Sequence, residues 1–134
     1  MNDIERRDLR KRTKLLALRI IKLYASLPKS TEAQVIGKQV LRIGTSVGAH
    51  YREAKRARST AEFISKIEGA LQELDETIYW LELLTESGIV PEAKLTNLKN
   101  EAVSSAKTAK DLSVESWSLS RKPVPAIPIG RRSV

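Results

Sequence analysis

The sequence predicts an all-α protein, an up-down antiparallel four-helix bundle. Three observations favour this class. Apolar residues recur at steps of three and four in four separate segments. Aromatic residues make up only 4% of the chain, whereas β-sandwiches concentrate aromatic side chains. Short connections join the segments, which favours antiparallel neighbours. The length of 134 residues fits one domain with one core.

The first predicted helix covers residues 3–26. Its inner stripe repeats at alternating steps of four and three and consists of Leu16, Ile20, Leu23 and Leu27. Pro28 ends the helix, because the residue before a proline is disfavoured in the helical conformation.

The second predicted helix begins after the N-cap Ser30 and reaches about Ala57, with Glu32 in its first turn. Its core stripe is Ala33, Ile36, Val40, Ile43 and Val47.

The third predicted helix begins at Ser59 or Thr60, where Glu62 completes a capping-box pattern. It has the most regular periodicity, a heptad seam of Ile64, Ile67, Leu71, Leu74, Ile78 and Leu81. Gly88 suits the position after its last turn.

The fourth predicted helix covers about residues 91–118, with Pro91 at its first position. Its stripe is poorer in large side chains and consists of Leu95, Leu98, Ala102, Ala109 and Leu112. Residues 1–120 thus form the bundle domain. Residues 121–134 contain three prolines and four cations, which predicts an extended or disordered basic tail.

Charge is distributed unevenly along the chain, whose net charge is +8. Residues 1–60 carry 15 Lys or Arg against 5 Asp or Glu, whereas residues 61–90 carry 1 against 7. A basic first half predicts a polyanionic partner, without identifying it.

The second helix carries a row of cations separated by small residues, and the first helix carries cations pointing away from its core stripe. Both sets could neutralise phosphates or could be solvated faces and internal ion pairs. The candidate nucleic-acid-binding residues are Arg7, Arg10, Lys11, Lys14, Lys22, Lys38, Arg42, Arg52, Lys55, Arg56 and Arg58.

The acidic residues Glu68, Asp75 and Glu82 recur every seven residues beside the seam of the third helix. Charges in this position usually set helix pairing, and Arg42 and Arg52 are their predicted partners. In that case part of the basic row has a structural role.

Two further features predict close contacts. Gly37, Gly44 and Gly48 form a stripe with Leu41, which allows a neighbouring helix of the same chain, or of a second subunit, to approach closely. Tyr79, Trp80 and Leu83, with Leu84, lie off the seam and predict an exposed apolar patch. The candidate oligomer interface therefore comprises Gly37, Leu41, Gly44, Gly48, Tyr79, Trp80 and Leu83, although the tail could cover the patch instead.

Nothing in the sequence predicts catalysis, a cofactor or a metal site. The chain has one histidine, His50, and no cysteine, so it lacks paired histidines and thiolate ligands. No phosphate-binding glycine loop precedes a helix. We find no signal peptide and no apolar run long enough to span a bilayer, and we expect a cytoplasmic location.

Several ordered motifs resemble one family. They include the string from Arg42 to Ala54, RIGTSVGAHYREA, and the string from Tyr79 to Leu84, YWLELL. Over about residues 10–90 the sequence is similar to the bacterial 23S rRNA intervening-sequence proteins, also called S23 ribosomal proteins. The resemblance implies four-helix bundles assembled into ring-shaped homopentamers.

The leading hypothesis is a non-enzymatic homo-oligomer that binds structured RNA or other nucleic acid through phosphate contacts. The alternative is a protein–protein scaffold, in which the basic row is used for ion pairs between helices or subunits.

Overall fold

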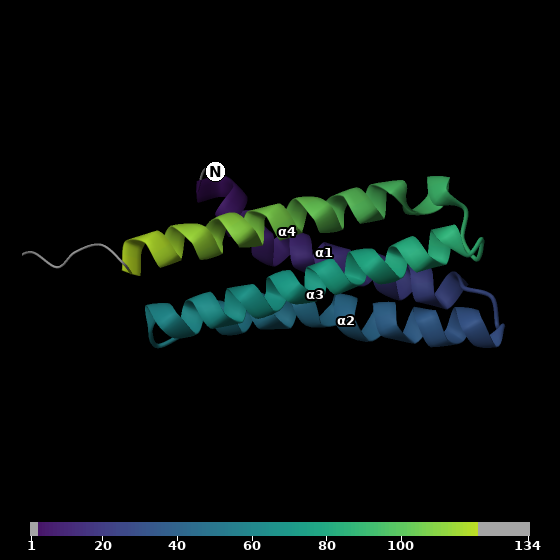
Figure 1. Cartoon of the computed structure of the whole chain (residues 1–134), viewed down its shortest axis with the longest axis horizontal. Coiled ribbons are helices and arrows are strands. Elements are labelled where there is room, and N and C mark those ends of the chain that lie inside the picture. Colours follow the sequence, from purple (N-terminus) through teal and green to yellow (C-terminus); the bar gives the residue numbers. More distant parts are fainter. Residues whose placement is uncertain (1–2, 121–134) are drawn as a thin grey trace, which may run out of the picture.

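The computed structural model describes residues 3–120, with side chains from residue 8 onward, as four helices and no strands. They are α1 (Asp3–Ser26), α2 (Thr31–Lys55), α3 (Thr60–Glu86) and α4 (Glu92–Ser120). Each helix packs on the next one along the chain, and α4 closes the bundle against α1 (Figure 1). The predicted four-helix bundle is confirmed for one chain. The predicted tail, residues 121–134, lies outside the described residues.

The predicted caps set the helix boundaries. The Ser30 hydroxyl accepts a hydrogen bond from the Ala33 amide at 3.4 Å, and the Ser59 hydroxyl accepts one from the Glu62 amide at 3.0 Å. The Arg58 amide donates to the Glu62 carboxylate at 3.1 Å, whereas in a usual capping box the donor is the amide of the N-cap residue, here Ser59. Gly88 has a φ of +80°, the left-handed conformation that ends α3.

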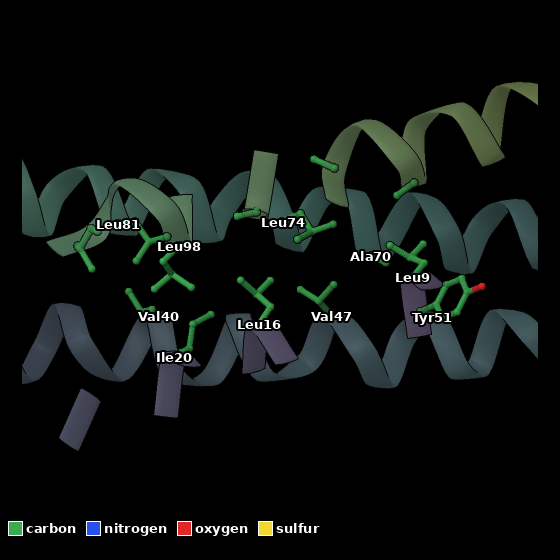
Figure 2. Close-up of a cluster of buried hydrophobic side chains, with 14 of the residues drawn as sticks. Leu9, Leu16, Ile20, Val40, Val47, Tyr51, Ala70, Leu74, Leu81 and Leu98 are labelled. Atoms are coloured by element: carbon green, nitrogen blue, oxygen red, sulfur yellow. The ribbon is translucent and has the colours of Figure 1, made fainter. Parts of the chain in front are cut away.

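The core lies along the bundle axis and contains most residues of the predicted stripes of all four helices. Figure 2 shows Leu16 and Ile20 of α1 between Val40 and Val47 of α2. Leu74 lies opposite them on α3 and is fully buried. The small side chains of α4 fill the remaining side, and all five residues of its predicted stripe are buried.

The buried face of α3 is rotated from the predicted seam. Leu71 and Ile78 are only partly buried, while Ala70 and Thr77 are buried between them. The Thr77 hydroxyl donates to the Glu73 carbonyl at 2.8 Å, so its burial leaves no unpaired donor. Leu84 is fully buried, and its predicted place in an exposed patch is wrong.

The glycines of α2 face α1 of the same chain. A Cβ at Gly37 would lie 2.5 Å from Leu27 Cδ1, and a Cβ at Gly44 would overlap Ile20 Cδ1. A Cβ at Gly48 would lie 3.3 Å from the Thr13 hydroxyl. Close approach within the chain therefore accounts for this stripe. The same-chain alternative of the prediction accounts for these three glycines, because α1 lies directly beside them.

Arg12 joins α1 to α4 through a polar contact that the sequence did not reveal. Its guanidinium donates to the Glu101 carboxylate at 3.0 Å, to the Ser104 hydroxyl at 2.7 Å and to the Thr108 hydroxyl at 3.0 Å. Three bonds from one planar group fix both the distance and the rotation of α4 relative to α1. Arg12 therefore has a structural role, unlike the cations around it.

Candidate nucleic-acid interface

The cations of α2 lie on the side of the helix opposite its buried stripe. Lys38, Arg42, Arg52 and Arg56 are all exposed. Between them, the Thr45 and Ser46 hydroxyls donate back to the carbonyls of Leu41 and Arg42 and add no bulk to the surface. The face consequently presents long cationic side chains above small residues.

Cations of α1 and α2 meet at one end of the bundle. A cleft of about 180 Å³ is lined by Arg10 of α1, by Arg52 and Lys55 of α2, and by Arg56, which follows α2. Leu9 and Tyr51 lie side by side beneath this end (Figure 2). Each side chain is buried, with 2% of its surface exposed. The apolar contact between α1 and α2 thus holds four positive side chains around one opening.

The C-terminus of α2 favours this concentration of charge. Arg52 and Lys55 occupy the last turn of α2, where the unpaired carbonyls carry partial negative charge. Arg56 follows as the C-cap, and its amide donates to the Glu53 carbonyl at 3.1 Å. In residues 8–120, no acidic side chain forms an ion pair with any of the four cleft residues. Their charges therefore remain available to an external anion.

The acidic residues of α3 do not pair with the basic row as predicted. Glu82 pairs with Lys99 of α4 at 3.0 Å, and Glu68 accepts a hydrogen bond from Ser113 of α4 at 3.2 Å. Their flank of α3 faces α4 rather than α2, and Asp75 between them is exposed. The prediction that Arg42 and Arg52 neutralise these residues within the chain is wrong.

The opposite flank of α3 faces α2 through different residues. Glu73 accepts from His50 Nδ1 at 2.5 Å, and Glu53 of α2 pairs with Lys66 at 3.5 Å. These contacts use no residue of the basic row. Heptad spacing identified a shared flank for Glu68, Asp75 and Glu82, but not the neighbour on that flank.

The other candidate cations do not line the cleft. Lys11, Lys14 and Lys22 are exposed along α1, and Arg58 is exposed in the turn after α2. Arg7 lies within α1, but its side chain is outside the described part. The structure therefore brings Arg10 close to the cations at the end of α2. The other candidates lie along the two helices, outside this group.

The exposed apolar surface differs from the predicted one. Tyr79 is 53% exposed, and its ring contacts the Trp80 ring edge to face with centroids 5.2 Å apart. Trp80, Leu83 and Leu41 are only partly buried. These four residues stay candidates for a contact with another molecule.

A second exposed apolar group was missed by the sequence analysis. Leu15, Leu18 and Ile21 are about half exposed on the outer side of α1. Their spacing of three residues, off the Leu16–Ile20 stripe, was the available signal. The first helix thus has apolar residues on both its inner and its outer face.

Residues 8–120 hold no group of three His, Asp or Glu side chains placed to bind a metal ion. Within residues 3–120, no helix combines the length and apolar character needed to cross a bilayer.

Comparison with known proteins agrees with the helical architecture. The model of the 23S rRNA-intervening sequence protein family matches residues 5–111. This chain belongs to that family. A similar solved structure is the crystal structure of a protein of unknown function from Bacteroides thetaiotaomicron VPI-5482, which belongs to the S23 ribosomal protein family. It is 36% identical, has a TM-score of 0.74, and the alignment covers 78% of this chain and 97% of the relative. No curated protein matches the sequence.

The match includes α2, α3 and most of α1 and α4, so all four cleft residues lie inside it. The end of α4 and residues 121–134 lie beyond it. The family match therefore includes most of the bundle and the residues of the basic cleft, but not the C-terminal segment.

Proposed function

We propose that this intervening-sequence family protein is a non-enzymatic, cytoplasmic protein that binds structured RNA or another nucleic acid through phosphate contacts. One observation carries the proposal: Arg10, Arg52, Lys55 and Arg56 line one cleft, and no acidic side chain in residues 8–120 pairs with them. The cations along α1 and α2 extend that surface. The name of the family, which refers to 23S rRNA, is consistent with an RNA partner.

Binding of this kind depends on charge and shape more than on base sequence. The described residues form only helices, without the aromatic sheet surface on which many RNA-binding domains stack bases. Each neutralised phosphate releases counterions, so four contacts in the cleft predict a slope of log K against log salt of about −3 to −4.

The test compares two pairs of charge-removing substitutions. Arg52→Gln with Arg56→Gln alters the cleft, whereas Lys107→Gln with Lys110→Gln removes the same charge from exposed positions of α4. Binding to a labelled RNA hairpin is measured by fluorescence anisotropy from low to high salt. We expect the cleft pair to weaken binding and reduce the salt slope by about 2, and the α4 pair to change the slope little. Equal effects of the two pairs would show that net charge alone drives binding.

A second proposal concerns assembly. The exposed outer face of α1, with Leu15, Leu18 and Ile21, and exposed Tyr79 of α3 favour association with another protein surface. We propose that the chain forms a homo-oligomer through such faces, and the ring of five subunits implied by the family resemblance is the expected form.

The scaffold alternative assigns the basic row to contacts between subunits instead of to nucleic acid. Light scattering separates the two functions. If the row binds nucleic acid, the Arg52 and Arg56 substitutions leave the particle mass unchanged. If the row pairs subunits, the same substitutions lower the mass even without RNA. Leu18→Ser serves as the control for the apolar face, and its particle mass should fall under both hypotheses.

A further inference from the structure

An open groove of about 490 Å³ lies between the start of α3 and the end of α4. Ile64 forms its floor and is 7% exposed, while Val114 and Trp117 form its rim and are 55% and 51% exposed. About half of the surface of each of these two large apolar side chains is exposed at one rim of the groove.

The sequence of α4 explains why the groove stays open. After Leu112, the α4 residue Ser113 lines the groove and is too small to fill the space beside Ile64. Ser113 donates its hydroxyl to the Glu68 carboxylate at 3.2 Å, which holds a negative group at the groove edge. The groove therefore has apolar walls and one acidic edge.

The chain itself supplies a segment of matching chemistry. Directly after Ser120 come two cations and then the sequence from Pro123 to Ile129, PVPAIPI. Residues 121–134 carry four cations and no acidic residue. Segments rich in proline favour the polyproline II conformation and bind grooves lined by aromatic side chains, because they lose little conformational entropy on binding.

The distances allow the segment to fold back. Ser120 follows Trp117 by three residues, about 4.5 Å along the helix. The α3 wall from Ala61 to Glu68 is about 10 Å long at 1.5 Å per residue. Seven residues from Pro123 to Ile129 span about 22 Å at 3.1 Å per residue, more than the groove requires.

We propose that residues 123–129 dock into the α3–α4 groove of their own chain, against Val114 and Trp117. A short tether gives the segment an effective concentration in the millimolar range, so a weak contact is enough for occupancy. A neighbouring groove lined by Arg58, Phe63 and Leu119 is a poorer match, because its charged residue repels the basic segment. Docking of this segment does not require RNA binding.

Trp117 fluorescence reports the docking directly. Trp80→Phe removes the other tryptophan, because the chain has only two. In this background the full chain is compared with a chain ending at Ser120, by emission wavelength and by acrylamide quenching. We expect the full chain to emit at shorter wavelength and to be quenched several-fold less. The peptide of residues 121–134, added at millimolar concentration, should restore protection to the shortened chain.

Two variants identify what the groove binds. In the full chain, replacing Val124, Ile127 and Ile129 by Ser keeps every charge and should expose Trp117 as fully as removal of the segment does. Leu119→Ser alters the neighbouring groove and should leave Trp117 protected. Circular dichroism checks that each variant keeps its helices.

Equal quenching of the full and shortened chains would overturn the proposal. Protection that disappears on dilution, in step with the particle mass, would instead place the segment in the groove of another copy and overturn the assignment to its own chain.

Discussion

Replacing Gly44 with alanine tests whether the α2 glycines serve the contact with α1. A Cβ at Gly44 would approach Ile20 Cδ1 to less than 3.0 Å, a separation that real Cβ atoms essentially never show. Ile20 is fully buried, so its side chain has little free space into which to move. We therefore expect Gly44→Ala to destabilise the fold.

The magnitude comes from two opposing effects. Alanine gains about 0.8–1 kcal/mol over glycine in a helix interior. Overpacking a dense core costs about 1–3 kcal/mol. The net expectation is a loss of about 0–2 kcal/mol in the free energy of unfolding. Gly69→Ala is the matched control, because a Cβ there meets only the His50 ring, at 3.8 Å. It should stabilise the protein by the helix effect alone, about 0.8–1 kcal/mol.

Urea unfolding followed by circular dichroism measures these changes. Ile20→Val removes the Cδ1 atom that Gly44→Ala would strike and by itself costs about 0.5–1.5 kcal/mol. The double variant should be more stable than the sum of the two single changes by about 1 kcal/mol. Strict additivity would refute the proposed contact, as would equal stabilisation by alanine at positions 44 and 69. Loss of particle mass without loss of stability would instead place Gly44 between subunits.

Three further predictions follow from other contacts. Leu74→Ala should cost about 2–5 kcal/mol in urea unfolding, because Leu74 is fully buried at the bundle centre; a cost below about 1 kcal/mol would contradict that burial. Arg12→Ala should cost about 1–3 kcal/mol by leaving the half-buried Glu101 carboxylate without its partner, and Arg12→Lys should recover only part, because an ammonium cannot bond three separated acceptors in one plane. Burial raises the pKa of the Tyr51 hydroxyl above its ordinary value of 10.0. The unfolded chain therefore loses this proton first, so stability should fall as pH rises above 10. Tyr51→Phe should make this decline shallower. A slope of unfolding free energy against pH that is the same in Tyr51→Phe as in the unsubstituted protein would contradict this prediction.

Local chemistry made the helix boundaries predictable from sequence. Ser30, Ser59 and Gly88 act through bonds or backbone conformations within a few residues of themselves, so no knowledge of the tertiary structure is needed. All three positions are confirmed in the structure.

The rotation of α3 was harder to predict. A search for large apolar residues selects Leu71 and Ile78, yet the α3 core face is centred nearer Ala70 and Thr77. A small or hydroxylated residue can be fully buried where helices approach closely, and its size gives no sign of this in the sequence. Such positions depend on the shape of the neighbouring helices.

The partners of the acidic residues of α3 could not be predicted from the pattern of that helix alone. Periodicity placed Glu68 and Glu82 on one flank of α3, but a bundle of either handedness is compatible with that pattern. The handedness decides whether the flank meets α2 or α4, and Lys99 of α4 is the partner of Glu82. The exposure of the α2 cations was predictable, whereas the absence of internal partners required the structure.

The up-down topology converts a charge difference along the sequence into one across the surface. Because consecutive helices are neighbours, the basic first half of the chain becomes two adjacent helices, and Arg10 meets Arg52 across their boundary. A crossover connection that placed α1 and α2 at opposite corners would separate these cations by the acidic α3. In this fold α3 pairs Glu82 with α4, on the far side from the basic row. The cleft is therefore a consequence of chain order as much as of composition, and a circular permutation that keeps the helix neighbours should retain it.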